Sequence, residues 1–156
     1  MDALTPEIRA VDPDDPALAP LIDRHLTLML ASSPACSVHA MDASALAEAG
    51  VRFFAAFVRE APVAMGALKT IAPDHGELKS MHVIEEMRGG GLADAILARL
   101  LDEARAAGMA RVSLETGSQP VFEPARGFYR RHGFSDCPPF EGYVEDPHSV
   151  FMTRAL

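Results

Sequence analysis

The chain has 156 residues, of which 49% are apolar and 23% are charged, and its formal net charge is −8. This length and composition are typical of one globular domain, which we expect over residues 1–156. The negative charge argues against a nucleic-acid or anionic-membrane partner. No apolar stretch approaches the roughly 18 residues of a bilayer span, and the acidic start is unlike a signal peptide, so a cytoplasmic protein is expected.

Three elements are predicted before residue 50. Polar and apolar residues alternate over 7–11, which predicts a short strand. Apolar residues recur at helical spacing from Leu18 to Met29 and predict an amphipathic helix. A second helix is predicted over 42–49, with Asp42 as its N-cap.

Strands dominate the middle of the chain. Residues 51–58 and 61–71 are strand-like runs separated by a short turn, which predicts a hairpin. A third strand is predicted from Leu78 to Val83. It leads through three consecutive glycines into a helix with an apolar stripe over 93–104.

The last third of the chain predicts a strand over 112–115, a helix over 121–132 and a final strand over 149–152. The full order is a strand, two helices, three strands, and then helix, strand, helix and one or more strands. This order favours an α/β layer protein in which a hairpin sheet continues into a parallel crossover.

The glycine run has the composition of an anion-binding loop. Gly89, Gly90 and Gly91 allow a sharp turn that brings several backbone N–H groups together. The helix that follows adds unpaired N–H donors and the positive end of its dipole, which suit a phosphate, and Arg88 can add a charged contact. The alternative is a flexible turn. The Walker lysine is missing, which argues against nucleotide hydrolysis.

Two motifs at this point resemble a known family. Arg88-x-x-Gly91-x-Ala93 resembles the pyrophosphate loop of GNAT N-acetyltransferases, and residues 125–134 resemble that family's Ala-x-x-x-Tyr-x-x-x-Gly-Phe segment. Other stretches are similar to one bacterial subgroup of the family: His39 to Asp42, Leu114 to Gly117, Pro124-Ala125 and Tyr143 to Met152. The resemblance covers nearly the whole chain, with one departure: Phe122 stands where many relatives have a cofactor-binding Asn.

The resemblance implies a mixed central sheet that splays between its fourth and fifth strands, with helices on both faces. It also implies acetyl-CoA (coenzyme A) as cofactor and direct attack of a primary amine on the thioester, through a tetrahedral intermediate. The acceptor would be a small molecule or a peptide. Family members often dimerise, so a homodimer is an expected partner. An acyl-CoA-binding regulatory domain with weak catalysis stays open as the alternative.

The family's cofactor contacts map onto backbone groups near Met81 and Val83. They also map onto the loop formed by Arg88, Gly89, Gly90, Gly91, Leu92 and Ala93. The resemblance implies that Tyr129 contacts the cofactor and is the acid for the departing thiolate. A backbone N–H near Met81 is the expected donor to the oxyanion.

The motifs say less about which residues bind the acceptor and which residue takes its proton. Glu77 is a candidate base for the amine, with Glu115 and His82 as alternatives. The expected acceptor-binding residues are Ser33, His39, Asp42 and Glu115, although Asp42 serves equally well as a helix cap.

A metal site is not expected, because no third ligand accompanies His39 and Asp42 at a useful spacing. The two cysteines are likewise expected to be reduced thiols and not metal ligands. His25 lies on an apolar helix face, which favours a hydrogen-bonded core histidine.

Overall fold

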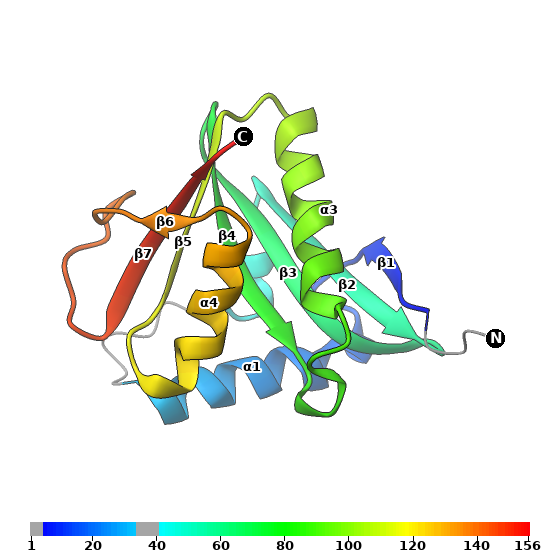
Figure 1. Cartoon of the computed structure of the whole chain (residues 1–156). Helices are drawn as coiled ribbons and strands as arrows, with labels where there is room; N and C mark the ends of the chain where they lie inside the picture. The colour runs from blue at the N-terminus through cyan, green and yellow to red at the C-terminus, as the bar shows by residue number, and fades with distance from the viewer. Residues whose placement is uncertain (1–4, 34–40) are drawn as a thin grey trace.

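The computed structural model describes residues 5–33 and 41–156, and its centre is a seven-stranded mixed sheet (Figure 1). The strand order is β1-β2-β3-β4-β5-β7-β6. The strands are β1 (Glu7–Ala10), β2 (Val51–Val58), β3 (Ala61–Ala72), β4 (His75–Val83), β5 (Arg111–Gly117), β6 (Ser135–Asp136) and β7 (Ser149–Ala155).

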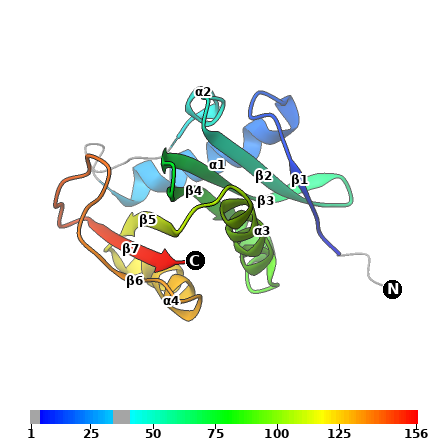
Figure 2. The same cartoon turned by 90° about the horizontal axis from the view of Figure 1, so that it is seen from above.

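Helices cover both faces of this sheet, as the view from above shows (Figure 2). One face carries α1 (Ala19–Ser32) and α2 (Ala43–Leu46), and the other carries α3 (Leu92–Ala106) and α4 (Glu123–Arg131). The described residues also form the short 3-10 turns η1 (Pro16–Leu18), η3 (Glu85–Met87) and η4 (Pro120–Phe122). Each face has its own buried apolar cluster, one under α3 and α4 and one under α1 and α2.

The predicted fold is confirmed, including the parallel crossover from β4 through α3 to β5. The second helix is shorter than predicted, because α2 ends at Leu46, although Asp42 does cap it by accepting a hydrogen bond from the Ala45 N–H at 2.9 Å. The last predicted helix begins as the 3-10 turn η4 before α4. The two-residue strand β6 is too short to leave a pattern in the sequence.

The sheet opens between β4 and β5. These two strands pair only from His75↔Arg111 to Leu78↔Leu114. Beyond that point β4 continues to Val83 and β5 to Gly117 without pairing to each other. The open end faces the loop that leads into α3, so the fold creates a split where the sequence motifs lie (Figure 1).

A bulge in β4 lies at the start of this split. Lys79 pairs with Ala67 and His82 pairs with Met65, so Ser80 and Met81 together oppose one residue, Gly66. Ser80 has a positive φ of 57°, the left-handed conformation that one type of β-bulge uses. Gly66 is needed here, because a Cβ at that position would lie 2.7 Å from the Met81 sulfur.

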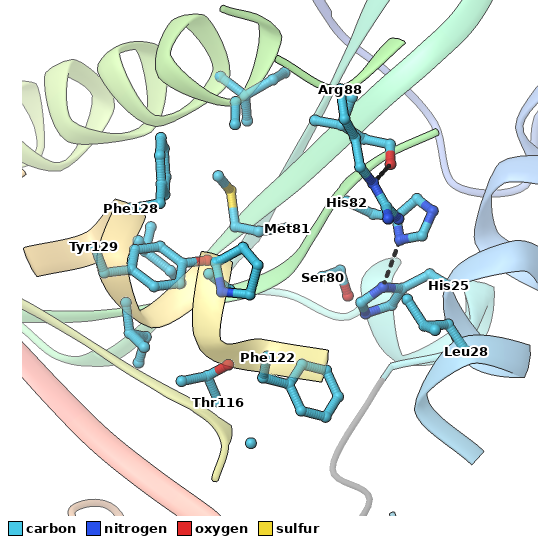
Figure 3. Close-up of a pocket in the computed structure, with 18 of the residues that line it drawn as sticks. His25, Leu28, Ser80, Met81, His82, Arg88, Thr116, Phe122, Phe128 and Tyr129 are labelled. Atoms are coloured by element: carbon cyan, nitrogen blue, oxygen red, sulfur yellow. Dashed lines mark hydrogen bonds between the residues drawn. The ribbon is translucent and has the colours of Figure 1, made fainter. Parts of the chain in front are cut away.

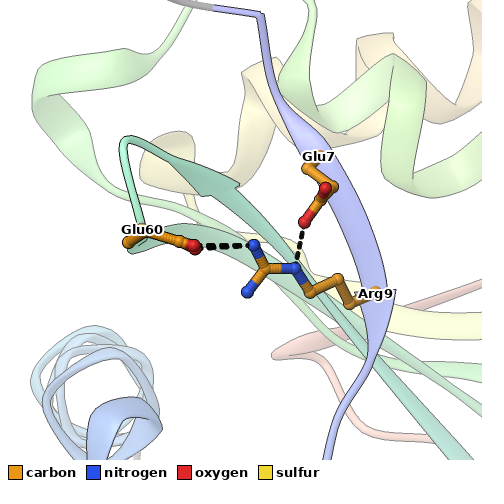
Figure 4. Close-up of polar contacts among 3 residues, drawn as sticks. All are labelled: Glu7, Arg9 and Glu60. Carbon is orange, nitrogen blue, oxygen red and sulfur yellow. Dashed lines mark hydrogen bonds and ion pairs between the residues drawn. The ribbon is translucent and has the colours of Figure 1, made fainter.

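At the β1 edge of the sheet, Arg9 forms an ion pair with Glu60 (Figure 4). Arg9 on β1 donates to both carboxylate oxygens of Glu60, at 2.8 and 2.9 Å, and to Glu7 on its own strand. Glu60 lies in the turn of the β2–β3 hairpin, so this contact ties the first strand to the hairpin. The pair is exposed and far from the split, and exposed pairs add little stability.

Within the described part of the chain, no helix combines the length and the apolar character that crossing a membrane requires.

Candidate active site

A cavity of about 630 Å³ occupies the split between β4 and β5. Its walls come from the end of β4, the start of α3, the end of β5, α4 and the inner side of α1 (Figure 3). It therefore passes from the face covered by α3 and α4 to the face covered by α1. A cavity of this size accommodates a long thin group that enters from one face and a second molecule that enters from the other.

The glycine loop forms one rim of the cavity. Gly89 and Gly91 have φ values of 83° and 87°, a conformation that favours glycine. Backbone N–H groups from Gly89 to Asp94 have no hydrogen-bond acceptor among the described residues. Unpaired donors at the start of a fifteen-residue helix suit a phosphate, so the loop fits the pyrophosphate of coenzyme A.

Five of the six residues of the predicted loop line the cavity, Gly90 being the sixth. The Arg88 side chain folds back, and its Nε donates to the carbonyl oxygen of Val83 at 3.1 Å (Figure 3). This contact closes the turn between the end of β4 and the loop. Arg88 is nevertheless part of the cavity lining and brings a positive charge to the rim.

Tyr129 lies on α4 and borders the cavity together with Met81 on β4 (Figure 3). Its ring packs edge-on against Phe128 and Phe134, with centroid distances of 5.3 and 5.6 Å. Its hydroxyl makes no hydrogen bond to any described residue. Burial raises the pKa of Tyr129 well above its ordinary value, so the hydroxyl remains protonated at neutral pH.

Phe122 stands at the position where the family resemblance predicts an Asn. Its ring is buried against Gly117, where a Cβ would lie 2.1 Å from the ring. Phe122 therefore forms an apolar wall of the cavity between β5 and α4 (Figure 3).

The predicted acceptor residues separate into three groups. Ser33 and Glu115 line the cavity; Ser33 Oγ accepts from Gln119 Nε2 at 3.1 Å, and Glu115 accepts from Ser149 Oγ at 2.8 Å. Asp42 caps α2 and is not among the described residues that line this cavity. His39 lies outside the described residues.

Glu77, the first candidate for the base, is buried and lies away from the cavity. Its side chain is 2% exposed, and its carboxylate accepts a hydrogen bond from the Tyr143 hydroxyl at 2.6 Å. It is absent from the cavity lining within the described part of the chain. The reason is that β4 starts three residues earlier than predicted, so Glu77 lies where β4 is still paired to β5.

Two histidines meet at the α1 end of the cavity (Figure 3). Nδ1 of His25 and Nδ1 of His82 are 3.2 Å apart. Burial, then the charges of His82 and Lys79, lower the pKa of His25 to about 3. Burial, then the charges of Arg88 and Arg24, lower the pKa of His82 to about 4. Both rings are therefore neutral at pH 7, and His25 is the hydrogen-bonded histidine that its position favours.

Sequence reasoning missed several polar residues of the cavity, among them Lys79, Ser80 and Arg131. Arg131 lies two residues after Tyr129 inside the matched motif, so its position could have drawn notice. Lys79 and Ser80 depend on the bulge in β4, for which the sequence offers no signal. Among the residues described, no three His, Cys, Asp or Glu side chains gather as metal ligands.

Known proteins resemble this chain over most of its length. The model of the acetyltransferase (GNAT) family matches residues 18–134. The uncharacterized N-acetyltransferase YsnE of Bacillus subtilis is 41% identical over 136 residues, which are 87% of this chain and 90% of that protein. The uncharacterized N-acetyltransferase YedL of Escherichia coli is 39% identical, with 96% and 94% covered. An IAA acetyltransferase of Azospirillum brasilense is 40% identical, with 79% and 80% covered.

Solved structures of acyltransferases have the same fold as this chain. A Klebsiella pneumoniae protein assigned as an acyl-CoA N-acyltransferase superposes with a TM-score of 0.80 at 25% identity, covering 97% of this chain and 98% of that one. The PaiA N-acetyltransferase of Thermoplasma acidophilum, solved with coenzyme A, has the same fold, with a TM-score of 0.77 at 17% identity and coverage of 98% and 100%. The chain therefore belongs to the acetyltransferase (GNAT) family and is an acyl-CoA-dependent acyltransferase that uses acetyl-CoA.

Proposed function

We propose that this enzyme moves the acetyl group of acetyl-CoA to a primary amine of a small molecule or peptide. In this proposal Tyr129, Met81 and Glu115 act at the reacting atoms. One observation carries it: the cavity in the split of the sheet is lined by Tyr129 on the α4 side and by Glu115 at the end of β5. A thioester between them would meet a donor on one side and a carboxylate on the other.

The residues proposed to hold the cofactor are those of the glycine loop and the end of β4. The N–H groups of Gly89 to Ala93 would donate to the pyrophosphate, and Arg88 would add its charge. Backbone groups near Met81 and Val83 would hold the pantetheine arm, and Tyr129 would contact its end. Acetyl-CoA, when bound, supplies a thioester whose carbonyl carbon accepts a nucleophile.

Each proposed chemical role uses one atom of the protein. The amine nitrogen bonds to the acetyl carbon, and the carbon–sulfur bond breaks. Glu115 takes the proton that the nitrogen loses, and the N–H of Met81 donates to the carbonyl oxygen as negative charge develops there. Because burial raises the pKa of Tyr129, complete proton transfer to a thiolate of ordinary pKa ~8.5 is uphill. Tyr129 therefore acts as a hydrogen-bond donor that stabilises the sulfur anion.

Glu115 is preferred to the other two base candidates. The Glu77 carboxylate is bonded to Tyr143 and lies outside the described cavity lining. His82 has a pKa lowered to about 4, which makes it a weak base, and its Nδ1 already faces His25. Glu115 lines the cavity, and Ser149 orients one of its oxygens.

The cofactor assignment is tested by two glycine variants with matched geometry. Gly91 and Gly108 lie just before and just after α3, have φ values of 87° and 80°, and have open space around a would-be Cβ. Gly91→Val and Gly108→Val should lose similar stability from the strained φ. We expect calorimetry to detect acetyl-CoA binding in the native enzyme and in Gly108→Val, and at least about 100-fold weaker binding in Gly91→Val.

Equal affinity in all three proteins would remove the loop from the cofactor site. Tight acetyl-CoA binding without thiol release across a broad amine panel would favour the acyl-CoA-binding regulatory domain. The cytoplasmic location and the homodimer stay predictions.

A further inference from the structure

The bulge in β4 gathers polar side chains on the α1 side of the cavity. Lys79 and His82 are three positions apart, so plain alternation would place them on opposite faces of the sheet. Their partners across the ladder, Ala67 and Met65, both pack in the cluster under α1. The extra residue of the bulge therefore brings Lys79 and His82 to the same face, and Ser80 lies between them.

Lys79 brings a nearly buried positive charge to this face. Its side chain is 12% exposed and lines the cavity. Its ammonium donates to the Tyr143 hydroxyl at 2.8 Å and lies 3.5 Å from the Glu77 carboxylate. Tyr143 also donates to Glu77, so the three side chains form one network that orients the ammonium.

The network places the two opposite charges at different depths. Glu77 is fully buried and outside the described lining of the cavity, whereas Lys79 is part of that lining. An ion pair in the protein interior is stable only with such supporting hydrogen bonds. The cavity wall therefore presents the cation of the pair, while its counter-ion lies behind.

Ser80 adds a hydroxyl without a partner. The residue is 9% exposed, and its Oγ is buried without a hydrogen-bond partner among the described residues. It faces the cavity near His25 (Figure 3). A buried hydroxyl without a partner is unfavourable, so this atom indicates a ligand that accepts a hydrogen bond here.

We propose that the acceptor is an amino carboxylic acid whose carboxylate is bound by the Lys79 ammonium and the Ser80 hydroxyl. This inference rests on the proposed function, because it concerns the molecule that brings the amine. The amine end of the same acceptor would approach Glu115, which lines the cavity from β5. The neutral His25 and His82 rings complete the wall around the carboxylate without adding a charge of their own.

The test compares amino acids with the corresponding amino acid amides. The amides keep the amine and side chain but lose the negative charge. We expect the native enzyme to acetylate some amino acids with kcat/KM at least about 10-fold above that of their amides, measured as thiol release and by product mass. Lys79→Met should remove this preference by lowering kcat/KM for the acid about 10- to 100-fold, because a charge-assisted hydrogen bond is lost. Activity with the amide should change little.

Lys69 provides the matched control, because Lys69 and Lys79 are the two lysines of the chain and Lys69 is not part of the described cavity lining. Lys69→Met should keep the preference for acids. Lys79→Met alone leaves the buried Glu77 carboxylate without its cation. The double variant Lys79→Met with Glu77→Gln removes both charges together, so it tests the loss of the ammonium without an unpaired buried carboxylate. Ser80→Ala, which leaves the ion pair intact, should lower kcat/KM for the acid about 3- to 10-fold through KM.

Equal use of acids and amides by the native enzyme would overturn the inference and leave the proposed function standing. Parallel losses for acid and amide in Lys79→Met would reduce Lys79 to a structural role and also overturn it. Failure of acetyl-CoA itself to bind would overturn the proposed function along with the inference.

Discussion

At the scale of single residues, Tyr129 is the side chain with the sharpest expected effect. Removing its hydroxyl in Tyr129→Phe leaves the packing of the ring against Phe128 and Phe134 in place. The thiolate then loses its donor, so we expect kcat to fall about 100-fold. Affinity for acetyl-CoA, measured by calorimetry, should stay within about threefold. Unchanged turnover would make Tyr129 a packing residue only.

Residues also differ in how far the sequence could predict them. The loop from Arg88 to Ala93 was predictable, because glycine, positive φ and a helix start act through local backbone geometry. Tyr129 was predictable because the motif fixes its place on α4. Lys79 and Ser80 were not, because their shared face depends on a bulge that arises from pairing with β3.

At the scale of elements, Gly66 in β3 leaves room for the side chains that pack opposite the bulge in β4. A methyl group there would approach Ile96, Leu100 and the Met81 sulfur to between 2.7 and 2.9 Å. Gly66→Ala should therefore lower the free energy of unfolding by about 1–3 kcal/mol. Because the Met81 side chain must shift and Met81 lines the cavity, the substitution should also lower kcat. Denaturant unfolding and the acetyl-transfer assay measure the two effects.

A second glycine serves as the control for this prediction. Gly127 lies within α4, and a Cβ there would approach nothing more closely than Arg131 at 3.5 Å. Gly127→Ala should be neutral or stabilise by up to about 1 kcal/mol, because alanine favours helix. Equal stability of both variants and the native protein would show that the bulge tolerates a side chain opposite it.

Element boundaries were harder to predict than element types. The helical stripe of α3 and the hairpin of β2 and β3 follow from periodicity over many residues. The second helix was predicted three residues too long, and β4 three residues too short at its start. That early start decides the position of Glu77, since three residues move it from the strand end into the paired part of the sheet.

At the scale of the whole molecule, His25 makes stability depend on pH. Burial, assisted by the nearby charges of His82 and Lys79, lowers its pKa to about 3, against roughly 6.5 in the unfolded chain. Below pH ~6.5 the unfolded chain takes up a proton that the folded protein resists. Stability is therefore complete above that pH and falls as pH decreases toward 3. At pH 5 the loss from His25 is about 2 kcal/mol.

Denaturant unfolding at pH 7.5 and pH 5 measures this loss. His25→Asn, which does not titrate, should lose less stability than the native protein over the same interval. Identical losses in the two proteins would assign the acid sensitivity to other groups.

The short pairing between β4 and β5 has a mechanical consequence. Only four residue pairs join the part of the sheet formed by β1 to β4 to the part formed by β5 to β7. Under a pulling force across the sheet, this seam would part before the longer antiparallel ladders on either side. The covalent connection through α3 would then still join the two parts of the sheet. A molecule bound across the split would contact both parts and raise the force needed to separate them.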